Sequence, residues 1–521
     1  MRSRIDLIET IRASVIGDDT VLDGPFGGRR MVYADYAASG RSLSFVEDFI
    51  RDEVLPFYAN THTESSATGR RMTELREQAR GAIHRAVGGS DDDVVIFCGT
   101  GATGAIDKLV RVLGLTEKER PVVFVGPYEH HSNELPWRES VADVVTIRED
   151  ADGRVDLTHL EDELRRYADR PLKIGSFSAA SNVTGIVTDV ERVATLLRLH
   201  GALSCWDYAA AGPHMPIAMS DKDAVFLSPH KFVGGPGTPG VLVAKRALFR
   251  NPVPAVPGGG TIRFVSPHGH SYHPDPAVRE EGGTPAIVES IRAGLAFALK
   301  EVVGADEIRR REQRIVRRAL ASWGANPNIE IVGNPNAERL AIVSLGLRHP
   351  PGLLHSHFVA AVLNDLFGIQ VRSGCFCAGP YIHRLYPIGD EWSRRMHAEV
   401  VSGHEGAKLS LLRVSFGYFM SDAVVDYIVA AVNLLANEGW KLLPLYRFDP
   451  DTGLWRHRSA RPASDRPATA PESVLPGYLE EARRILRGVV PVRAEDPALS
   501  RSFERIRWFP LPGEAMAESV R

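Results

Sequence analysis

The stretch Ala224-Val-Phe-Leu-Ser-Pro-His-Lys-Phe-Val-Gly-Gly-Pro-Gly-Thr-Pro-Gly240 is the part of this 521-residue chain that determines the predicted fold. An apolar run typical of a buried strand ends at Ser228-Pro-His-Lys231, and glycines and prolines separate it from a second apolar run at 241–244. Burial at a strand end lowers the pKa of a lysine, because the cation loses its hydration, and the free amine can then form a Schiff base. A surface lysine on a glycine-rich loop has the same local sequence, so Lys231 needs support from the rest of the chain.

Apolar runs and helical patterns alternate on both sides of this stretch. Helical patterns occupy residues 105–113 and 190–199. Strands joined by crossover helices predict a mostly parallel sheet that is covered on both faces. Ligands of such sheets bind beyond the carboxyl ends of the strands, so we expect the polar residues there to share one crevice. The predicted strands are 94–97, 122–125, 144–147, 174–177, 203–206, 224–227 and 241–244.

Three further polar features follow predicted strands in this order. Gly99-Thr-Gly-Ala-Thr-Gly104 opens a helix and suits a phosphate monoester, although it is not a nucleotide P-loop. Glu129-His-His-Ser-Asn133 supplies histidines that could stack on a ring and move protons, and no further ligands lie at a metal-site spacing. Asp207 is either a helix cap or the buried partner of a cation such as a protonated pyridine nitrogen. With Lys231, these features indicate pyridoxal phosphate as cofactor.

Composition excludes several other classes. The chain is 44% hydrophobic and 24% charged, which suits a large core and about two or three domains. A net charge of -3 gives no reason to expect nucleic acid or an anionic membrane as partner. We find no apolar run of membrane-spanning length and no signal-peptide core near Met1. Four cysteines are too few for a disulfide scaffold and favour a reducing, cytoplasmic setting; they are Cys98, Cys205, Cys375 and Cys377.

The order of patterns predicts four regions. Residues 1–30 form an N-terminal segment that packs on the small domain, and residues 31–285 form the large cofactor-binding domain. Residues 286–438 form a smaller α+β domain, which opens with one long charged helix at 286–323. Residues 439–521 are rich in Arg and Pro and form an extension that packs on the body or is partly disordered, with a helix near 476–486.

Taken together, the motifs resemble fold-type I pyridoxal-phosphate enzymes, and within them the class V aminotransferase and cysteine desulfurase family. The resemblance spans roughly residues 31–437. It implies an α/β fold with a mainly parallel seven-stranded sheet, flanking helices and a smaller α+β C-terminal domain. The matching motifs are Gly101-Ala-Thr103, Glu129-His-His-Ser-Asn-Glu-Leu-Pro-Trp137, Ser178–Asn182, Asp207-Tyr-Ala, Ser228-Pro-His-Lys231, Gly258-Gly-Gly-Thr-Ile262, Glu281-Gly-Gly-Thr-Pro285, Arg372-Ser-Gly-Cys-Phe-Cys-Ala378 and Leu412-Arg-Val-Ser-Phe416.

The same resemblance implies roles for individual residues. Lys231 would hold the cofactor as a Schiff base and move a proton, His130 would stack on its ring, and Asp207 would pair with the pyridine nitrogen. Thr284 would reach the partner subunit's phosphate, which implies a homodimer. The implied cofactor-binding set is Ala102, Thr103, His130, Asn182, Asp207, Ser228, His230, Lys231 and Thr284, and the implied substrate-binding set is Asn182, Arg372 and Arg413.

The stretch Arg372–Ala378 resembles the loop that carries the nucleophilic cysteine of desulfurases, including the desulfurase domain of molybdenum cofactor sulfurases. A thiolate in a partly open loop could take sulfur from a cysteine-like substrate and become a persulfide. By the resemblance this nucleophile is Cys377, whereas Cys375 is a helper thiol, a resolving thiol or a buried small side chain. Two departures bear on the substrate: Ala210 stands where relatives often have Gln, and Cys375 and Phe376 replace histidines.

The sequence therefore predicts a cytoplasmic, homodimeric, pyridoxal-phosphate-dependent enzyme that resembles cysteine desulfurases. Its expected substrate is L-cysteine or a related small amino acid, and a sulfur-acceptor protein is a possible partner. The alternatives are a carbon–sulfur β-lyase, a selenocysteine lyase, or an aminotransferase or epimerase. A non-catalytic sulfur-relay protein is a further alternative from a different class. No metal, nucleic acid or membrane is expected to take part.

Overall fold

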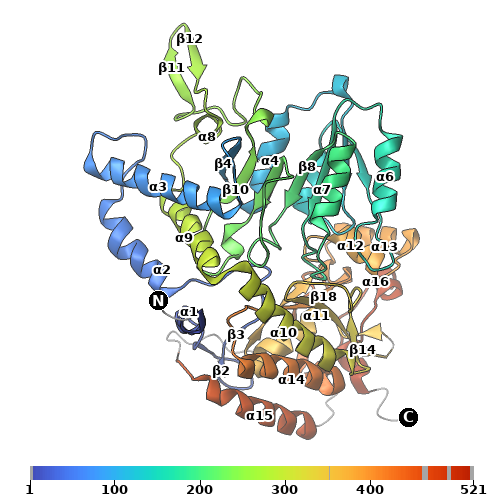
Figure 1. Cartoon of the computed structure of the whole chain (residues 1–521). Coiled ribbons are helices and arrows are strands. Elements are labelled where there is room, and N and C mark those ends of the chain that lie inside the picture. Colours follow the sequence, from blue (N-terminus) through green and yellow to red (C-terminus); the bar gives the residue numbers. More distant parts are fainter. Residues whose placement is uncertain (1–3, 351, 460–467, 490–493, 517–521) are drawn as a thin grey trace.

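The computed structural model describes residues 4–350, 352–459, 468–489 and 494–516 of the chain (Figure 1). Two sheets with their helices lie one above the other in this view, and the N-terminal and C-terminal segments both lie near the lower one. No helix of the described part is long and apolar enough to cross a membrane.

Within the described residues, seven strands form the upper sheet in the order β4-β10-β9-β8-β7-β5-β6. Strand β10 runs antiparallel to both of its neighbours, and the other pairs are parallel. All seven predicted strands are present, and each strand end lies within one residue of its predicted position. Their bounds are β4 Asp93–Cys98, β5 Val122–Val125, β6 Asp143–Thr146, β7 Lys173–Ser178, β8 Leu203–Asp207, β9 Ala224–Leu227 and β10 Gly240–Lys245.

Helices cover both faces of this sheet, which explains why its central strands are apolar at successive positions. Side chains alternate between the faces, so Val95 and Phe97 of β4 point to one core and Val94 and Ile96 to another. Helix α4 (Gly101–Leu113) covers the second face. The first face is covered by α3 (Ala67–Ala86), α6 (Leu157–Arg166), α7 (Val190–Leu199) and α9 (Ile287–Val303).

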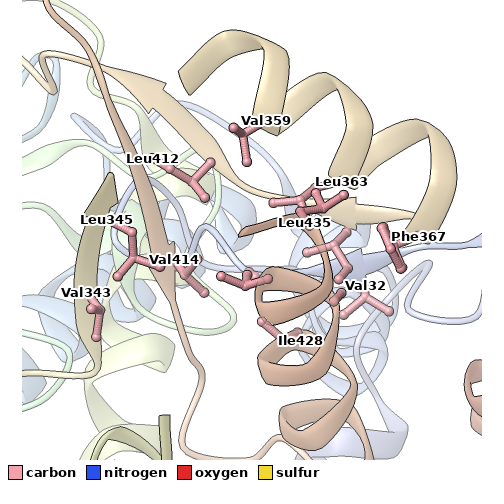
Figure 2. Packing of buried hydrophobic residues seen from close by; sticks show 14 of the residues in the cluster. Val32, Val343, Leu345, Val359, Leu363, Phe367, Leu412, Val414, Ile428 and Leu435 are labelled. Carbon is pink, nitrogen blue, oxygen red and sulfur yellow. The ribbon is translucent and has the colours of Figure 1, made fainter. Parts of the chain in front are cut away.

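The lower sheet is antiparallel and follows the order β13-β14-β18-β17 along its main path. Figure 2 shows Val343 and Leu345 of β14 and Leu412 and Val414 of β18 in one apolar cluster with residues of two helices. Val32 of β3, near the N-terminus, joins the same cluster. The bounds are β3 Val32–Tyr33, β13 Ile329–Ile331, β14 Ile342–His349, β17 Arg372–Gly374, β18 Leu411–Ser415, α11 Ser356–Phe367 and α14 Asp422–Glu438.

The prediction of one long helix at 286–323 is wrong. The structure has two helices there, α9 and α10 (Ala305–Gly324), which are separated by Gly304. The φ of Gly304 is 87°, a value that an L residue rarely adopts and that ends a right-handed helix. The charged, helix-forming residues on both sides of Gly304 concealed this break. Elements without a sequence prediction include α6, α12 (Gly379–Leu385), α13 (Asp390–Val401) and a projecting hairpin, β11 (Ile262–Ser266) with β12 (Gly269–Tyr272) (Figure 1).

The described part of the extension packs on the lower sheet. Phe448, Trp455, Phe503 and Phe509 are buried in the same apolar cluster as β14 and β18. Ile8 and Ile11 of α1 (Arg4–Ala13) also belong to that cluster. The extension contains β19 Tyr446–Phe448, β20 Trp455–His457, α15 Leu475–Gly488 and α16 Arg501–Ile506. The four predicted region boundaries remain predictions.

Candidate active site

A cavity of about 150 Å³ lies at the carboxyl ends of the parallel strands. The sequence predicted polar residues at this position, because the carboxyl ends of parallel strands lie along one edge of the sheet. Eight of the predicted site residues line this cavity: Ala102, Thr103, His130, Asn182, Asp207, Ser228, His230 and Lys231. Thr284, Arg372, Cys377 and Arg413 do not line it.

One wall of the cavity is the start of helix α4. The backbone N–H of Ala102 donates to Ser228 Oγ over 2.9 Å, which ties the helix start to the end of β9. Gly101 has φ of 54°, and a Cβ at this position would come within 2.8 Å of His230 Cε1. Thr103 Oγ1 lies 2.6 Å from Ser132 Oγ. A helix N-terminus with nearby hydroxyls is suited to an anion.

Lys231 and Asp207 enter the cavity from the ends of neighbouring strands. Burial lowers the pKa of Lys231 to about 8, and the carboxylate of Asp207 partly opposes this shift. Burial also raises the pKa of Asp207. Among described residues, Ala209 donates its N–H to Asp207 Oδ1 over 2.7 Å. The site therefore combines a readily deprotonated amine with a buried carboxylate that a cationic ring nitrogen would stabilise.

His130 is held as a neutral imidazole. Its Nδ1 accepts a hydrogen bond from the N–H of Ser132 at 3.1 Å, which places the proton of the neutral ring on Nε2. Burial, together with the positive charge of Lys231, lowers the pKa of His130 to about 3. A neutral ring fixed at one nitrogen is suited to stacking on a flat ligand.

Glu129 organises the strand ends behind the cavity. Its buried carboxylate accepts hydrogen bonds from Asn133 Nδ2 at 2.6 Å, Ser178 N at 2.8 Å and Ser178 Oγ at 2.6 Å. Burial raises its pKa to about 7, although these donors favour the charged form. The network joins the segment after β5 to the end of β7. Sequence reasoning gave Glu129 no role, and the available signal was an acid between a buried strand and two histidines.

The two candidate sulfur residues lie in a tight turn, here called the cysteine turn and defined as residues 375–378. The N–H of Ala378 donates to the carbonyl of Cys375 over 3.0 Å. The two central residues, Phe376 and Cys377, have φ of 53° and 55°. Left-handed backbone at a residue other than glycine costs about 1–3 kcal/mol, so the surroundings must hold this turn in place.

Three hydrogen bonds from the cavity side hold the cysteine turn. Asn182 Nδ2 donates to the carbonyl of Phe376 over 2.8 Å. His131 N donates to the carbonyl of Cys377 over 2.7 Å, and Gly379 N donates to His131 Nε2 over 3.0 Å. Cys377 and Cys375 are half-buried and unpaired, whereas the remaining two cysteines of the chain are buried.

Arg413 lies next to the turn and is already paired. Its Nη2 contacts Asp35 Oδ1 at 2.9 Å, and its Nη1 donates to the carbonyl of Asn182 at 3.0 Å. The ring of Phe376 lies 4.7 Å from the guanidinium carbon. Arg413 is buried, whereas Arg372, opposite it in the β17–β18 pairing, is exposed. Sequence reasoning missed Asp35, and the available signal was an acid two residues after β3.

Thr284 lies apart from the cavity. It is exposed, and Asn60 Nδ2 lies 3.5 Å from its Oγ1. Thr61 and Glu281, near these two residues in the chain, line an open hollow of about 640 Å³. Arg76 and Glu281 form an ion pair within this hollow.

Comparison with known proteins agrees with this geometry. The family model described as aminotransferase class-V matches residues 32–428. A probable cysteine desulfurase of Staphylococcus aureus is 30% identical over 378 residues, covering 71% of this chain and 89% of that protein. A probable cysteine desulfurase of Streptomyces coelicolor is 30% identical over 365 residues, covering 68% of this chain and 84% of that protein.

Solved structures are similar in fold. A cysteine desulfurase from Thermococcus onnurineus NA1 aligns with a TM-score of 0.68 and 23% identity, covering 84% of this chain and 99% of that chain. A cysteine desulfurase from Escherichia coli aligns with a TM-score of 0.65 and 22% identity over the same shares.

The fold and the matches define the class first: this is the fold-type I architecture of pyridoxal-phosphate enzymes. More particularly, the chain belongs to the aminotransferase class-V family. The predicted fold class and the prediction of an enzyme that resembles cysteine desulfurases are confirmed. The roles of the individual site residues remain predictions.

Proposed function

We propose that this enzyme removes sulfur from L-cysteine or a closely related amino acid, giving alanine and a persulfide on Cys377. The observation that carries the proposal is the cysteine turn, in which Asn182, itself part of the cavity wall, donates to the carbonyl of Phe376, the residue before the half-buried Cys377. The relatives named as probable cysteine desulfurases support the same reaction.

Pyridoxal phosphate fits the residues of the cavity. The Oδ1 of Asn182 is buried and accepts no hydrogen bond from any described residue, so a polar ligand group would satisfy it. A Cβ on Gly101 would come within 2.9 Å of both Ser228 and His230, so glycine lets the start of α4 lie directly against these two residues. Lys231 would bind the aldehyde and Asp207 the ring nitrogen, while the start of α4, with Thr103, would hold the phosphate.

The chain's own groups then divide the work. Pyridoxal phosphate, when bound, supplies an electron sink for bonds to the substrate's α-carbon. Lys231, whose lowered pKa makes its free amine available near neutral pH, would accept the α-proton. Neutral His130 would lie over the ring and present Nε2–H as a proton donor.

Cys377 would carry the sulfur. Its thiolate attacks the substrate sulfur, the new S–S bond forms, and the carbon–sulfur bond breaks with its electron pair left on carbon, which takes up a proton to give alanine. The substrate carboxylate would bind at Arg372 or at Arg413, where it competes with Asp35.

The assembly and the surroundings belong to the same proposal. Thr284 is exposed beside an open hollow, which supports a homodimer in which Thr284 reaches the partner subunit's phosphate. A persulfide on a half-buried cysteine needs a protein or small-molecule sulfur acceptor. Four unpaired cysteines accord with a cytoplasmic setting.

The test compares the Cys377→Ser and Cys375→Ser variants of the holoenzyme with L-cysteine, measuring alanine, pyruvate and protein persulfide. For Cys377→Ser we expect alanine formation to fall on the order of 10³-fold or more, as when a covalent nucleophile is removed. Cys375→Ser should still form the persulfide. Pyruvate as the wild-type product indicates β-elimination instead, and full alanine formation by Cys377→Ser excludes Cys377 as the acceptor.

A further inference from the structure

His131, the neighbour of the ring-stacking candidate His130, contacts the cysteine turn through its backbone and the residue after the turn, Gly379, through its side chain. Its N–H donates to the carbonyl of Cys377 over 2.7 Å. Its Nε2 accepts from the N–H of Gly379 over 3.0 Å. The two bonds lie on either side of Ala378, so a single residue fixes the backbone directly after the thiol.

The side-chain bond also caps a helix. Gly379 is the first residue of α12, and the residue before it, Ala378, supplies no side-chain cap. The first N–H groups of a helix lack partners within the helix. His131 Nε2 supplies one from a distant segment, and the turn and the helix start are therefore held together.

The imidazole must be neutral, with its proton on Nδ1, to accept this bond. Burial lowers the pKa of His131. The carboxylate of Glu134 opposes this shift, while the guanidinium of Arg138 reinforces it. The ring of His130, itself neutral, lies 6.3 Å away between ring centroids. The acceptor form of His131 is therefore the one present at neutral pH.

We propose that His131 is a positioning residue that holds Cys377 in its left-handed conformation and so sets the placement of the sulfur-accepting thiol. This inference rests on the proposed role of Cys377. The reason is that Cys377 has φ of 55°, a conformation that a free loop would leave, and His131 bonds the backbone on both sides of the next residue. One short segment thus joins the cofactor-stacking residue to the thiol.

The test uses three variants of the full-length holoenzyme. His131→Ala removes the acceptor, and His131→Gln places an amide oxygen near the position of Nε2 but cannot be protonated. His383→Gln is the matched control, because His383 lies on α12 close to the turn but contacts Ser393 rather than the turn backbone. Iodoacetamide labelling of Cys377, followed by peptide mass spectrometry, reports the turn without any turnover, and persulfide formation from L-cysteine is measured in a single turnover.

We expect His131→Ala to slow persulfide formation about tenfold and to speed Cys377 labelling by a similar factor, as for the loss of one buried hydrogen bond. His131→Gln and His383→Gln should stay within about twofold of the wild type at about pH 8. When the pH is lowered well below the ordinary histidine pKa of 6.5, labelling of the wild type should rise relative to His131→Gln, because only the wild type loses its acceptor.

Three results would overturn the inference: equal labelling in His131→Ala and the wild type, equal impairment in the Ala and Gln variants, or a pH response that His131→Gln retains. If His131→Ala does not fold, the comparison of His131→Gln with the wild type across pH decides alone. Failure of the proposed function gives a different result. Cys377→Ser would then keep its alanine formation, while the labelling comparison would still report whether His131 holds the cysteine turn.

Discussion

At the scale of single residues, the site is organised by charge states that burial sets. Burial pushes Lys231 toward the neutral amine, His130 toward the neutral ring and Asp207 toward the protonated acid. The neutral amine of Lys231 can react with an aldehyde, and the neutral ring of His130 can stack on a flat ring. The carboxyl group of Asp207 can pair with a cationic nitrogen, which stabilises its charged form. This is the pattern of perturbed titration that functional sites show.

The pKa of Lys231 predicts how the apoprotein takes up pyridoxal phosphate. Attachment needs the neutral amine, and a pKa of about 8 in place of 10.5 makes half of it neutral at about pH 8. The rate of borohydride-trapped attachment should therefore rise with pH through about 8 and then level off. Lys231→Ala should give no trapped adduct in the cavity. A rate that keeps rising to pH 10.5 would contradict the lowered pKa.

Residue types at the strand ends could be predicted from sequence, but their pairings could not. Lys231 and Asp207 each follow an apolar run, and this position alone brought them to one crevice. The pairing of Asp35 with Arg413, in contrast, joins segments that are 378 residues apart. The left-handed backbone of Phe376 had no signal either, because such a conformation normally selects glycine or asparagine.

At the scale of elements, the strands could be predicted because a parallel strand buried on both faces is apolar at every position. Val122–Val125 was predicted with the bounds that the structure has. Short helices that follow the cysteine turn were missed, since α12 begins with Gly379 and Pro380, and its cap comes from His131 rather than from a nearby residue. Local patterns do not reveal a cap supplied from another part of the chain.

Strand β10 lies very close to the start of α4, and a substitution at Gly240 can test whether this close approach matters. A Cβ on Gly240 would come within 1.9 Å of the carbonyl oxygen of Gly101. Gly240→Ala should therefore displace the helix start, destabilise the fold by about 1–3 kcal/mol and weaken retention of pyridoxal phosphate. Unfolding in denaturant and cofactor absorbance after dialysis measure the two effects.

Gly477 provides the matched control for this substitution. It lies in the first turn of α15, and a Cβ there meets nothing within 4 Å. Gly477→Ala should raise the free energy of unfolding by up to about 1 kcal/mol, because alanine is the better helix former. If Gly240→Ala behaved like this control, the close approach of β10 to α4 would not matter for cofactor retention.

At the scale of the whole molecule, the extension packs against the lower sheet and contacts the N-terminal segment. Arg29 forms an ion pair with Glu481 at 3.0 Å, and Arg30 N donates to the hydroxyl of Tyr478 at 3.2 Å. Ser421 Oγ donates to Glu472 at 2.7 Å. Packing on the body was one of two predictions for the extension, and its composition, rich in Arg and Pro, could not decide between them because the aromatic residues that anchor it are widely spaced.

Substitution of Phe509 tests how much the extension contributes to the stability of the fold. It is fully buried against Phe448 and Trp508. Phe509→Ala should destabilise the protein by about 3–5 kcal/mol, as for other buried aromatic truncations. Leu454→Ala is the control, since Leu454 is 40% exposed in the same extension and should cost under about 1 kcal/mol. Equal denaturation midpoints for the two variants would show that the extension is dispensable for the fold.

The same packing has a consequence for the order in which the protein acquires its structure during synthesis. The upper sheet is built from residues 93–245, a continuous stretch that can assemble once it has left the ribosome. The apolar cluster around the lower sheet contains both Ile8 and Phe509, which are 501 residues apart in the chain. This cluster can therefore be completed only after the segment that carries Phe509 has been synthesised, long after the upper sheet.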